Sequence, residues 1–480
     1  MRELAPQASA SANSATRSGD LQRYREIAYQ NHSLEFKVGK NRQMRSTDYE
    51  QLENDAVSIC QKLIQIPSVN FGEGNGNEKE IAIFVSNFLT ECGIENQIID
   101  SAPNRSNVIA RIKGVDSSRS GLVLHGHLDT VPATVEDWKH DPWSGQIIDG
   151  EIWGRGAVDM KDMDAMILAV VADWQRTGFI PPRDIVLAFF ADEEAGSLFG
   201  SRWLVENRSE LFENCSEAIS EVGGFSATLP NGKRFYLIEN AEKGFHWMRL
   251  ISEGTAGHGS MINLENAITA LSESVARIGT YEWPIRQTKT VNFFLSKVAE
   301  ACNLQYDPDH PENIVAQLGS MARMIGATTR NTANPTMLES GYKANVIPQT
   351  ATATIDGRFL PGHEVEFMST MHALLNEGVR IETIATDSAL EFPFEGKLVD
   401  AMCAAIVSED PEGIPVPYCM SGGTDNKALA ILGITGFGFA PLKLPPDLDF
   451  MSLFHGINER VPVSSLKFGV RVLDKFLQNC

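Results

Sequence analysis

Short apolar runs alternate with amphipathic stretches along most of this 480-residue chain. Residues 122–124 and 185–190 are continuously apolar, too short for helices and bounded by polar or glycine residues, which predicts buried strands. Residues 49–66 and 161–174 instead carry apolar side chains at helical spacing. Because such strands and helices follow one another in turn, the pattern indicates an α/β layer sandwich.

The pattern changes near Gly244. Strand-like alternation and helical spacing then predict a smaller α+β unit from three segments, 245–252, 263–278 and 351–359. Residues 281–340, which contain four prolines, read as an irregular insertion. The α/β pattern resumes after residue 388. We therefore predict one α/β domain interrupted by a second, with the boundaries 48–243, 244–388 (insertion 281–340) and 389–480.

Residues 1–47 differ in composition from the rest of the chain. They are rich in Ser, Ala, Asn and Gln and carry eight Lys/Arg against four Asp/Glu. We expect a disordered leader. A transit peptide is also Arg- and Ser-rich, and Met44 is an alternative start of the folded part, so both of these interpretations stay open.

The bulk composition excludes several classes of partner. With 62 acidic and 41 basic residues the formal net charge is −21, so nucleic acid and anionic membranes are not expected partners. No apolar run is long enough to span a bilayer. The seven cysteines are scattered and never form a Cys-x-x-Cys pair, which argues against a disulfide framework and a thiolate zinc site. We expect a cytoplasmic protein.

Chemically active side chains gather where the two predicted strands end. His127 and Asp129 follow the first strand and suit a metal ligand and the carboxylate that orients it. Glu193 and Glu194 follow the second strand and point to opposite sides of an extended backbone, so one can bind metal while the other faces a water. Because open α/β sheets place their sites at the carboxyl ends of strands, we predict a metal site there.

Three later residues extend this set. Asp159 lies in a glycine-punctuated loop that opens a helix, Glu221 ends a further strand, and His455 adds a late imidazole. Taken singly, each is more often an ordinary core or surface group. We expect His125 to be a packed imidazole, and we interpret four neighbouring acids as solvated charges, namely Glu136, Asp137, Asp162 and Asp164.

A series of short motifs makes the combination specific. They are His127-Leu-Asp-Thr-Val-Pro, Gly154-Arg-Gly-Ala-Val-Asp-Met-Lys, Asp192-Glu-Glu-Ala-Gly, Gly257-His-Gly-Ser, Asn345-Val-Ile-Pro, Gly422-Gly-Thr-Asp and His455-Gly. In this order they resemble the aminoacylase/carboxypeptidase family of di-zinc metallopeptidases, which includes glutamate carboxypeptidase, acetylornithine deacetylase and the carnosinases. The resemblance runs from about Leu52 to the C-terminus, and the long insertion resembles the carboxypeptidase S-like branch.

The resemblance implies a zinc-exopeptidase-like α/β catalytic domain interrupted by a smaller α+β lid and dimerisation domain. It makes Asp159 the carboxylate that bridges two zinc ions, with Glu194 and His455 on one ion and His127 and Glu221 on the other. Asp129 would orient His127, and Glu193 would be the general base toward a water that bridges the ions. Cobalt or manganese would also suit such nitrogen and oxygen ligands.

The resemblance also implies a substrate side. His258 would stabilise the oxyanion, often from the partner subunit of a homodimer. Asn345, Arg358, Gly422 and Gly423 would contact substrate, with the Arg358 guanidinium on a free carboxylate. A surface ion pair is the alternative for Arg358. Glu221 is followed by Val-Gly-Gly-Phe, whereas relatives often have Pro or Gly there, which leaves the local loop and substrate choice open.

We therefore expect a di-zinc hydrolase of the carboxypeptidase or dipeptidase type, which cuts an amide next to a free carboxylate. An N-acyl-amino-acid deacylase of the aminoacylase type is the alternative. A catalytically silent binding protein is a remote third, because every expected ligand and Glu193 are present. A single-zinc protease of the His-Glu-x-x-His type is excluded by the lack of that motif.

Overall fold

A mixed sheet of ten strands forms the larger part of the fold in this computed structural model, which describes residues 47–72 and 74–480. The strand order is β1-β2-β6-β3-β7-β18-β9-β16, and β8 and β17 also pair with β9. The strands are β1 (Asn96–Ala102), β2 (Arg105–Ile112), β3 (Gly121–His127), β6 (Ile185–Phe190), β7 (Cys215–Ser220), β8 (Phe225–Thr228), β9 (Arg234–Glu242), β16 (Leu390–Glu391), β17 (Gly413–Met420) and β18 (Thr435–Gly438). The expected leader lies outside the described residues.

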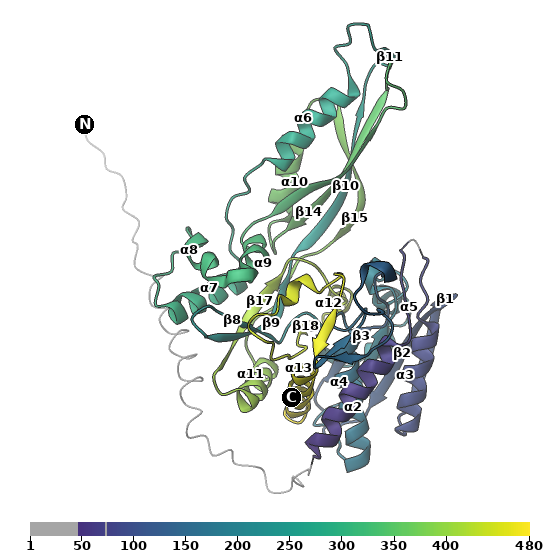
Figure 1. Cartoon of the computed structure of the whole chain (residues 1–480), viewed down its shortest axis with the longest axis vertical. Coiled ribbons are helices and arrows are strands. Elements are labelled where there is room, and N and C mark those ends of the chain that lie inside the picture. Colours follow the sequence, from purple (N-terminus) through teal and green to yellow (C-terminus); the bar gives the residue numbers. More distant parts are fainter. Residues whose placement is uncertain (1–46, 73) are drawn as a thin grey trace, which may run out of the picture. The chain divides into compact units, whose positions relative to one another are not determined.

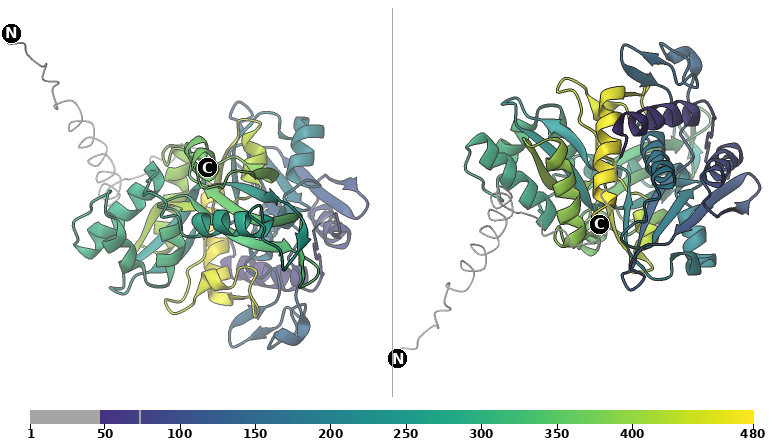
Figure 2. Two further views of the ribbon diagram at one scale, coloured as in Figure 1. Left: turned by 90° about the horizontal axis from the view of Figure 1, so that it is seen from above. Right: turned by 90° about the horizontal axis from the view of Figure 1, so that it is seen from below.

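Helices cover both faces of this sheet (Figures 1 and 2). On one face pack α2 (Tyr49–Ile64), α3 (Lys79–Glu91), α4 (Lys161–Thr177), α11 (Lys397–Glu409) and α13 (Val463–Leu477), and on the other α5 (Ser201–Asn207) and α12 (Asn426–Ala430). Alternate residues of β6 enter the two cores: Leu187 joins the first and Val186 the second. A strand buried on both faces reads as continuously apolar, which explains the run at 185–190.

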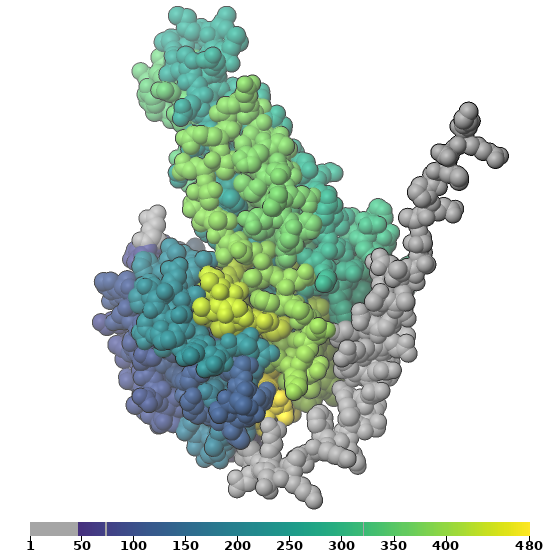
Figure 3. Space-filling model, turned by 180° about the vertical axis from the view of Figure 1, so that it is seen from behind, coloured from purple at the N-terminus to yellow at the C-terminus, as the bar shows by residue number. Residues whose placement is uncertain are grey.

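Both ends of the described chain build this one sheet. β18 pairs parallel to β7, and α13 packs on α2. In the space-filling view the purple and blue early residues and the yellow late residues belong to the same body (Figure 3). The α/β prediction is thereby confirmed.

The prediction that Asp162 and Asp164 are solvated was wrong. Both lie on α4, where every residue from Lys161 to Trp174 is buried. Burial raises the pKa of Asp162 to about 8, which favours the neutral form of this carboxyl. Helical spacing could not reveal this, because it does not show that α4 packs on β3, where Asp164 lies against Gly126, and is also covered by α2 and α13. Glu136 and Asp137 are exposed as expected.

A second, antiparallel sheet has the order β12-β14-β10-β15 and a core of its own. Its strands are β10 (Gly244–Glu253), β12 (Thr332–Ser340), β14 (Thr350–Phe359) and β15 (Val379–Asp387). Helices α6 (Ala267–Gly279) and α10 (Glu364–Ala373) pack on one face, and alternate residues of β14 are buried under them. A short ribbon, β11 (Gly257–His258) with β13 (Val346–Ile347), extends this unit (Figure 1).

Residues 281–340 are more regular than their composition indicated. They form α7 (Lys289–Cys302), α8 (Glu312–Val315), α9 (Ala322–Ala327) and β12. Phe294, Leu295 and Val298 of α7 join the core of the larger sheet, whereas β12 is an edge strand of the smaller one. The prolines lie mainly between these elements, where they do not break a helix.

A small three-stranded sheet links two loops that matter below. It consists of β4 (Ile147–Ile148), β5 (Glu151–Trp153) and β19 (Arg460–Pro462). Across residues 47–72 and 74–480, each helix is too short or too polar to cross a bilayer.

Candidate metal centre

Three parallel strands end at the same edge of the larger sheet and bring the first candidate ligands together. β3 lies between β6 and β7 and runs parallel to both. His127 is the last residue of β3, Glu221 directly follows β7, and Glu193 opens a 3₁₀ turn shortly after β6. Nε2 of His127 lies 3.5 Å from Oε2 of Glu221. The candidate ligands that follow these strands therefore lie close together, as expected.

Asp159 joins two sets of ligands. Its Oδ1 lies 3.0 Å from Nε2 of His127, and its Oδ2 lies 3.1 Å from Nε2 of His455. The same His455 nitrogen lies 2.9 Å from Oε2 of Glu194. One carboxylate thus faces two imidazoles, with Glu221 on one side and Glu194 on the other, which is the arrangement needed to bridge two ions.

Glu193 also lies within reach of this cluster. Its carboxylate, His127 and Glu221 offer atoms within 4.8 Å of one another, as do His127, Asp159 and Glu194. Geometry alone therefore allows Glu193 to act either as a ligand or as a free base beside the ligands.

The chemistry of these side chains fits divalent metal ions. His127 is 1% exposed and Glu221 5%, so their polar atoms lack bulk water. With neutral imidazoles, Asp159, Glu194 and Glu221 place three negative charges in one small volume, and buried charges must be paired or bind metals. Two divalent cations would supply that positive charge, and imidazole with carboxylate ligands suits zinc, cobalt or manganese.

The pKa shifts show the same need for positive charge. Burial lowers the pKa of His127, but the carboxylates of Glu221 and Asp159 outweigh burial and raise it well above its usual value. Burial raises the pKa of Glu221 to about 8, and the neighbouring Asp159 contributes. Burial and the charge of Glu221 raise the pKa of Glu193 well above its usual range. Either protonated imidazoles or bound metal ions can compensate the negative charge of such carboxylates.

Backbone strain gathers at the same place. Asp192, Val222 and His455 have positive φ angles of 68°, 55° and 56°. A non-glycine residue in this region costs about 1–3 kcal/mol, and a β-branched one is a clear outlier. Val222 directly follows the candidate ligand Glu221. The strained backbone at these three positions directs the adjoining ligands into the cluster.

Asp129 holds the turn that carries Glu193 and Glu194. Its Oδ1 accepts the Glu193 amide at 3.1 Å, and its Oδ2 accepts the Glu194 amide at 3.1 Å. Nδ1 of His127 lies 2.9 Å from the carbonyl oxygen of Asp129 and 3.7 Å from its Oδ1. Asp129 therefore orients His127 through its backbone and the acidic turn through its side chain.

A buried polar layer under this turn was missed by the sequence analysis. Asn70 donates to Asp129 at 2.8 Å and to Asp192 at 3.0 Å. Arg105 pairs with Asp192 and, at 2.9 Å, with Glu78. These residues are single polar positions far apart in the chain, so no local pattern identifies them. The expected packed role of His125 is borne out, since this buried ring lies 3.0 Å from Oδ1 of Asn426.

Glu459 is a second residue that the sequence analysis missed. It is fully buried and accepts hydrogen bonds from Arg155 at 2.8 Å and from the amides of Gly156 at 3.0 Å and Val158 at 2.8 Å. The loop that carries Asp159 is thus fixed to the segment that carries His455. Its only signal in the sequence is its position shortly after the His455 motif.

His258 and Asn345 lie together on the β11–β13 ribbon, although 87 positions separate them in the chain. His258 pairs with Val346, and the amide of Gly259 donates to the Asn345 carbonyl at 2.9 Å. Both residues are exposed. Within the part of the chain that the structure describes, no hydrogen bond or ion pair joins His258 to the acidic cluster; its Nδ1 lies 2.8 Å from Oγ of Ser260.

Arg358 has an acidic partner within the chain, and Gly423 lies against Lys427. Arg358 forms a two-pronged pair with Asp356 at 2.7 and 3.1 Å and lies over the Phe245 ring. The ion pair that the sequence analysis gave as the alternative interpretation of Arg358 is therefore present in the structure. In the described residues the amides of Gly422 and Gly423 donate no hydrogen bond, and a Cβ on Gly423 would meet Lys427 at 2.4 Å.

Comparison with known proteins agrees with this geometry. Residues 123–479 match the family described as Peptidase family M20/M25/M40. The chain is 30% identical to the probable carboxypeptidase S-like 2 of Dictyostelium discoideum (74% of this chain, 70% of that protein) and 25% identical to human aminoacylase-1 (88% and 95%). The dipeptidase Dug1p from Saccharomyces cerevisiae shares the fold at a TM-score of 0.66 with 19% identity, covering 90% of this chain and 96% of its own.

Replacement of Glu459 tests how the Asp159 loop is held. We expect Glu459→Ala to lower zinc affinity by roughly tenfold or more, because it leaves Arg155 and two backbone amides buried without their acceptor. Glu459→Gln retains an acceptor oxygen and should lose less. Chelator competition measures the affinity, and circular dichroism checks the fold. The matched control is Glu151→Ala, which removes a partly exposed ion pair with Arg460. Wild-type affinity in folded Glu459→Ala would contradict this role.

Proposed function

This chain belongs to peptidase family M20/M25/M40 and is a metal-dependent hydrolase, and on that premise we propose that it cleaves an amide bond beside a free carboxylate. The observation that carries the proposal is Asp159, whose two oxygens face His127 and His455. A carboxylate so placed suits two metal ions that share it.

We assign the ligands in two sets. Asp159, Glu194 and His455 would hold one ion, and Asp159, His127 and Glu221 the other, with zinc as the proposed metal and cobalt or manganese as chemically suitable replacements. Two such ions would polarise the scissile carbonyl and acidify a water. Asp129 and Glu459 hold the loops that carry these ligands in place through the hydrogen bonds described above.

Glu193 is the proposed general base. The amide anchor on Asp129 fixes its backbone next to Glu194, and its carboxylate reaches the ligand cluster. From this position it can take the proton of the attacking water and deliver it to the leaving nitrogen. His258 would then donate to the oxygen that becomes negative in the tetrahedral state, with Asn345 beside it.

The substrate would be a small peptide or an N-acyl amino acid. Both carry a free carboxylate, for which the guanidinium of Arg358 is well shaped and to which the amides of Gly422 and Gly423 could donate. Peptidase activity of the carboxypeptidase or dipeptidase type is our first proposal, supported by the D. discoideum relative. Deacylation is the second, supported by aminoacylase-1 and by human PM20D1, named N-fatty-acyl-amino acid synthase/hydrolase and 27% identical over 440 residues.

We further propose a homodimer in a reducing compartment such as the cytoplasm. The loop that follows β11 carries strongly exposed apolar side chains at Met261, Ile262 and Leu264, which suits contact with a second copy. All seven cysteines are unpaired, which suits a reducing compartment.

We also propose the domain boundaries. Residues 48–243 and 389–480 would form the catalytic domain, and residues 244–388 a lid and dimerisation domain. Helices α7 to α9 lie within 244–388 but would belong to the catalytic domain, because they pack on its core.

Metal removal combined with a substrate panel tests the proposed function. We expect about two zinc ions per chain by elemental analysis, loss of activity on chelation and recovery on addition of zinc. The panel pairs dipeptides and N-acyl amino acids with their carboxyl-amidated forms, and only the free acids should be cleaved. Equal cleavage of the amidated forms would contradict the assignment of a carboxylate site.

The variant Glu193→Gln tests whether Glu193 is a general base or a metal ligand. It should reduce kcat by about 10²–10⁴ while the zinc content stays at the wild-type value, because a general base contributes to rate and not to metal binding. The control is Glu206→Gln, an exposed position on α5. Loss of zinc in Glu193→Gln would instead make Glu193 a ligand, which its distance from His127 and Glu221 allows.

Mixing two inactive variants tests whether His258 acts across a dimer. Random pairing of His258→Ala with Glu193→Gln makes half the dimers mixed, each with one intact site, so about a quarter of wild-type activity should return. Subunit exchange is confirmed separately with tagged chains. Absence of recovery in exchanged dimers would exclude action from the partner subunit.

A further inference from the structure

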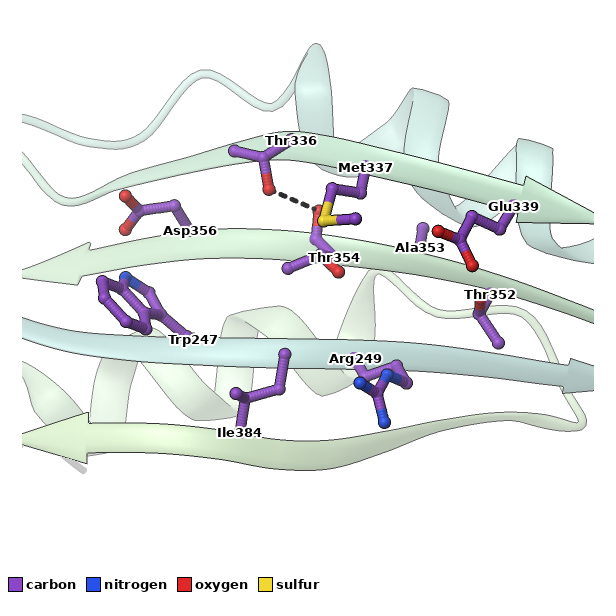
Figure 4. Close-up of a pocket in the computed structure, with 10 residues that line it drawn as sticks. All are labelled: Trp247, Arg249, Thr336, Met337, Glu339, Thr352, Ala353, Thr354, Asp356 and Ile384. Carbon is purple, nitrogen blue, oxygen red and sulfur yellow. Dashed lines mark hydrogen bonds between the residues drawn. The ribbon is translucent and has the colours of Figure 1, made fainter. Parts of the chain in front are cut away.

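The face of the second sheet that α6 and α10 leave open carries a pocket. Side chains from all four strands line a cavity of about 310 Å³ on this face (Figure 4). On β14 the buried residues alternate with half-buried ones, and Thr354, Asp356 and Arg358 share the open face. The pocket is thus built on a rigid sheet and not on a loop.

Its lining is mixed: four apolar residues share it with three threonines and three charged residues, Arg249, Glu339 and Asp356. Trp247, Met337 and Ile384 are 41%, 56% and 44% exposed, which is high for large apolar side chains on a packed sheet. Arg249 pairs with Glu382 at 3.2 Å, and Asp356 pairs with Arg358. Glu339 forms no ion pair among the described residues, so it is the apolar part of the lining, at Trp247, Met337 and Ile384, that suits an uncharged apolar group.

The pocket begins beside the proposed carboxylate site. Arg358 lies opposite Phe245 in the β10–β14 register, and Asp356 lies opposite Trp247. Two positions along a strand span about 7 Å. The Phe245 and Trp247 rings are 4.9 Å apart, so an aromatic surface runs from the guanidinium into the pocket.

We propose that this pocket receives a large apolar side chain on the amino acid whose free carboxylate Arg358 binds. The inference rests on the proposed function. In an amino acid the carboxylate and the side chain leave the same carbon, so a residue held by Arg358 directs its side chain to this neighbourhood. The acyl group lies on the far side of the scissile amide. Phenylalanine, leucine, methionine and tryptophan are the residues that fit.

Trp247→Ala tests the proposal with substrates matched in all but one side chain. The panel is N-acetyl-phenylalanine against N-acetyl-alanine, and Gly-Phe against Gly-Ala, with N-palmitoyl-alanine to report on acyl length. We expect kcat/KM for the phenylalanine substrate to fall about tenfold or more, and that for its alanine partner to stay within about twofold. Met337→Ala should act in the same direction, and Val365→Ala, 81% exposed on α10, is the control.

Four results would overturn the inference. An equal loss on phenylalanine and alanine substrates would assign Trp247 a structural role. A loss that follows acyl length would assign the pocket to the acyl chain. A changed oligomeric mass in Trp247→Ala, measured by light scattering, would make the open face an interface. A wild-type enzyme that cleaves none of the panel would overturn the proposed function itself, which separates that failure from the others.

Discussion

Compensation of buried negative charge is the constraint on which this structure depends. Asp159, Glu194 and Glu221 converge at the ends of parallel strands, and the imidazoles of His127 and His455 lie between them. Carboxylates this close require positive charge, which divalent ions supply more completely than two imidazoles do. The ligand loops, the strained backbone and the buried polar layer around them all serve to hold this costly arrangement.

The support for the cluster comes from distant parts of the chain. Asp129 fixes the acidic turn after β6, and Glu459 fixes the loop of Asp159 to the segment of His455. Lys427 ties the two sheets where the chain passes between them, since its Nζ donates to the carbonyls of Lys243 at 2.7 Å and Ser388 at 2.6 Å. Lys427 thereby holds the loop with Gly422 and Gly423 next to both segments that connect the sheets. The two glycines belong to the proposed carboxylate site, so the same contacts hold that part of the site.

Much of the architecture could be predicted from local patterns. The apolar runs at β3 and β6, the helical spacing of α2 and α4 and the alternation of β10 and β14 all placed their elements within a few residues. Residues 281–340 were harder, because their prolines separate elements that periodicity alone does not assign to either sheet. Asp162 and Asp164 were misjudged, since a charged residue on a helix gives no local sign that neighbouring helices bury it.

The sequence by itself determined the α/β class, the family and the types of residue at the candidate centre, because strand ends and short motifs are local in the chain. Only the tertiary structure decided that the two oxygens of Asp159 face different imidazoles, that Asp129 holds its neighbours through backbone amides, and that Glu459 and Arg105 are buried supports. The pocket on the open face of the second sheet is also a feature that only the tertiary structure reveals. Such features depend on distances between segments that lie tens to hundreds of residues apart, which no local pattern encodes.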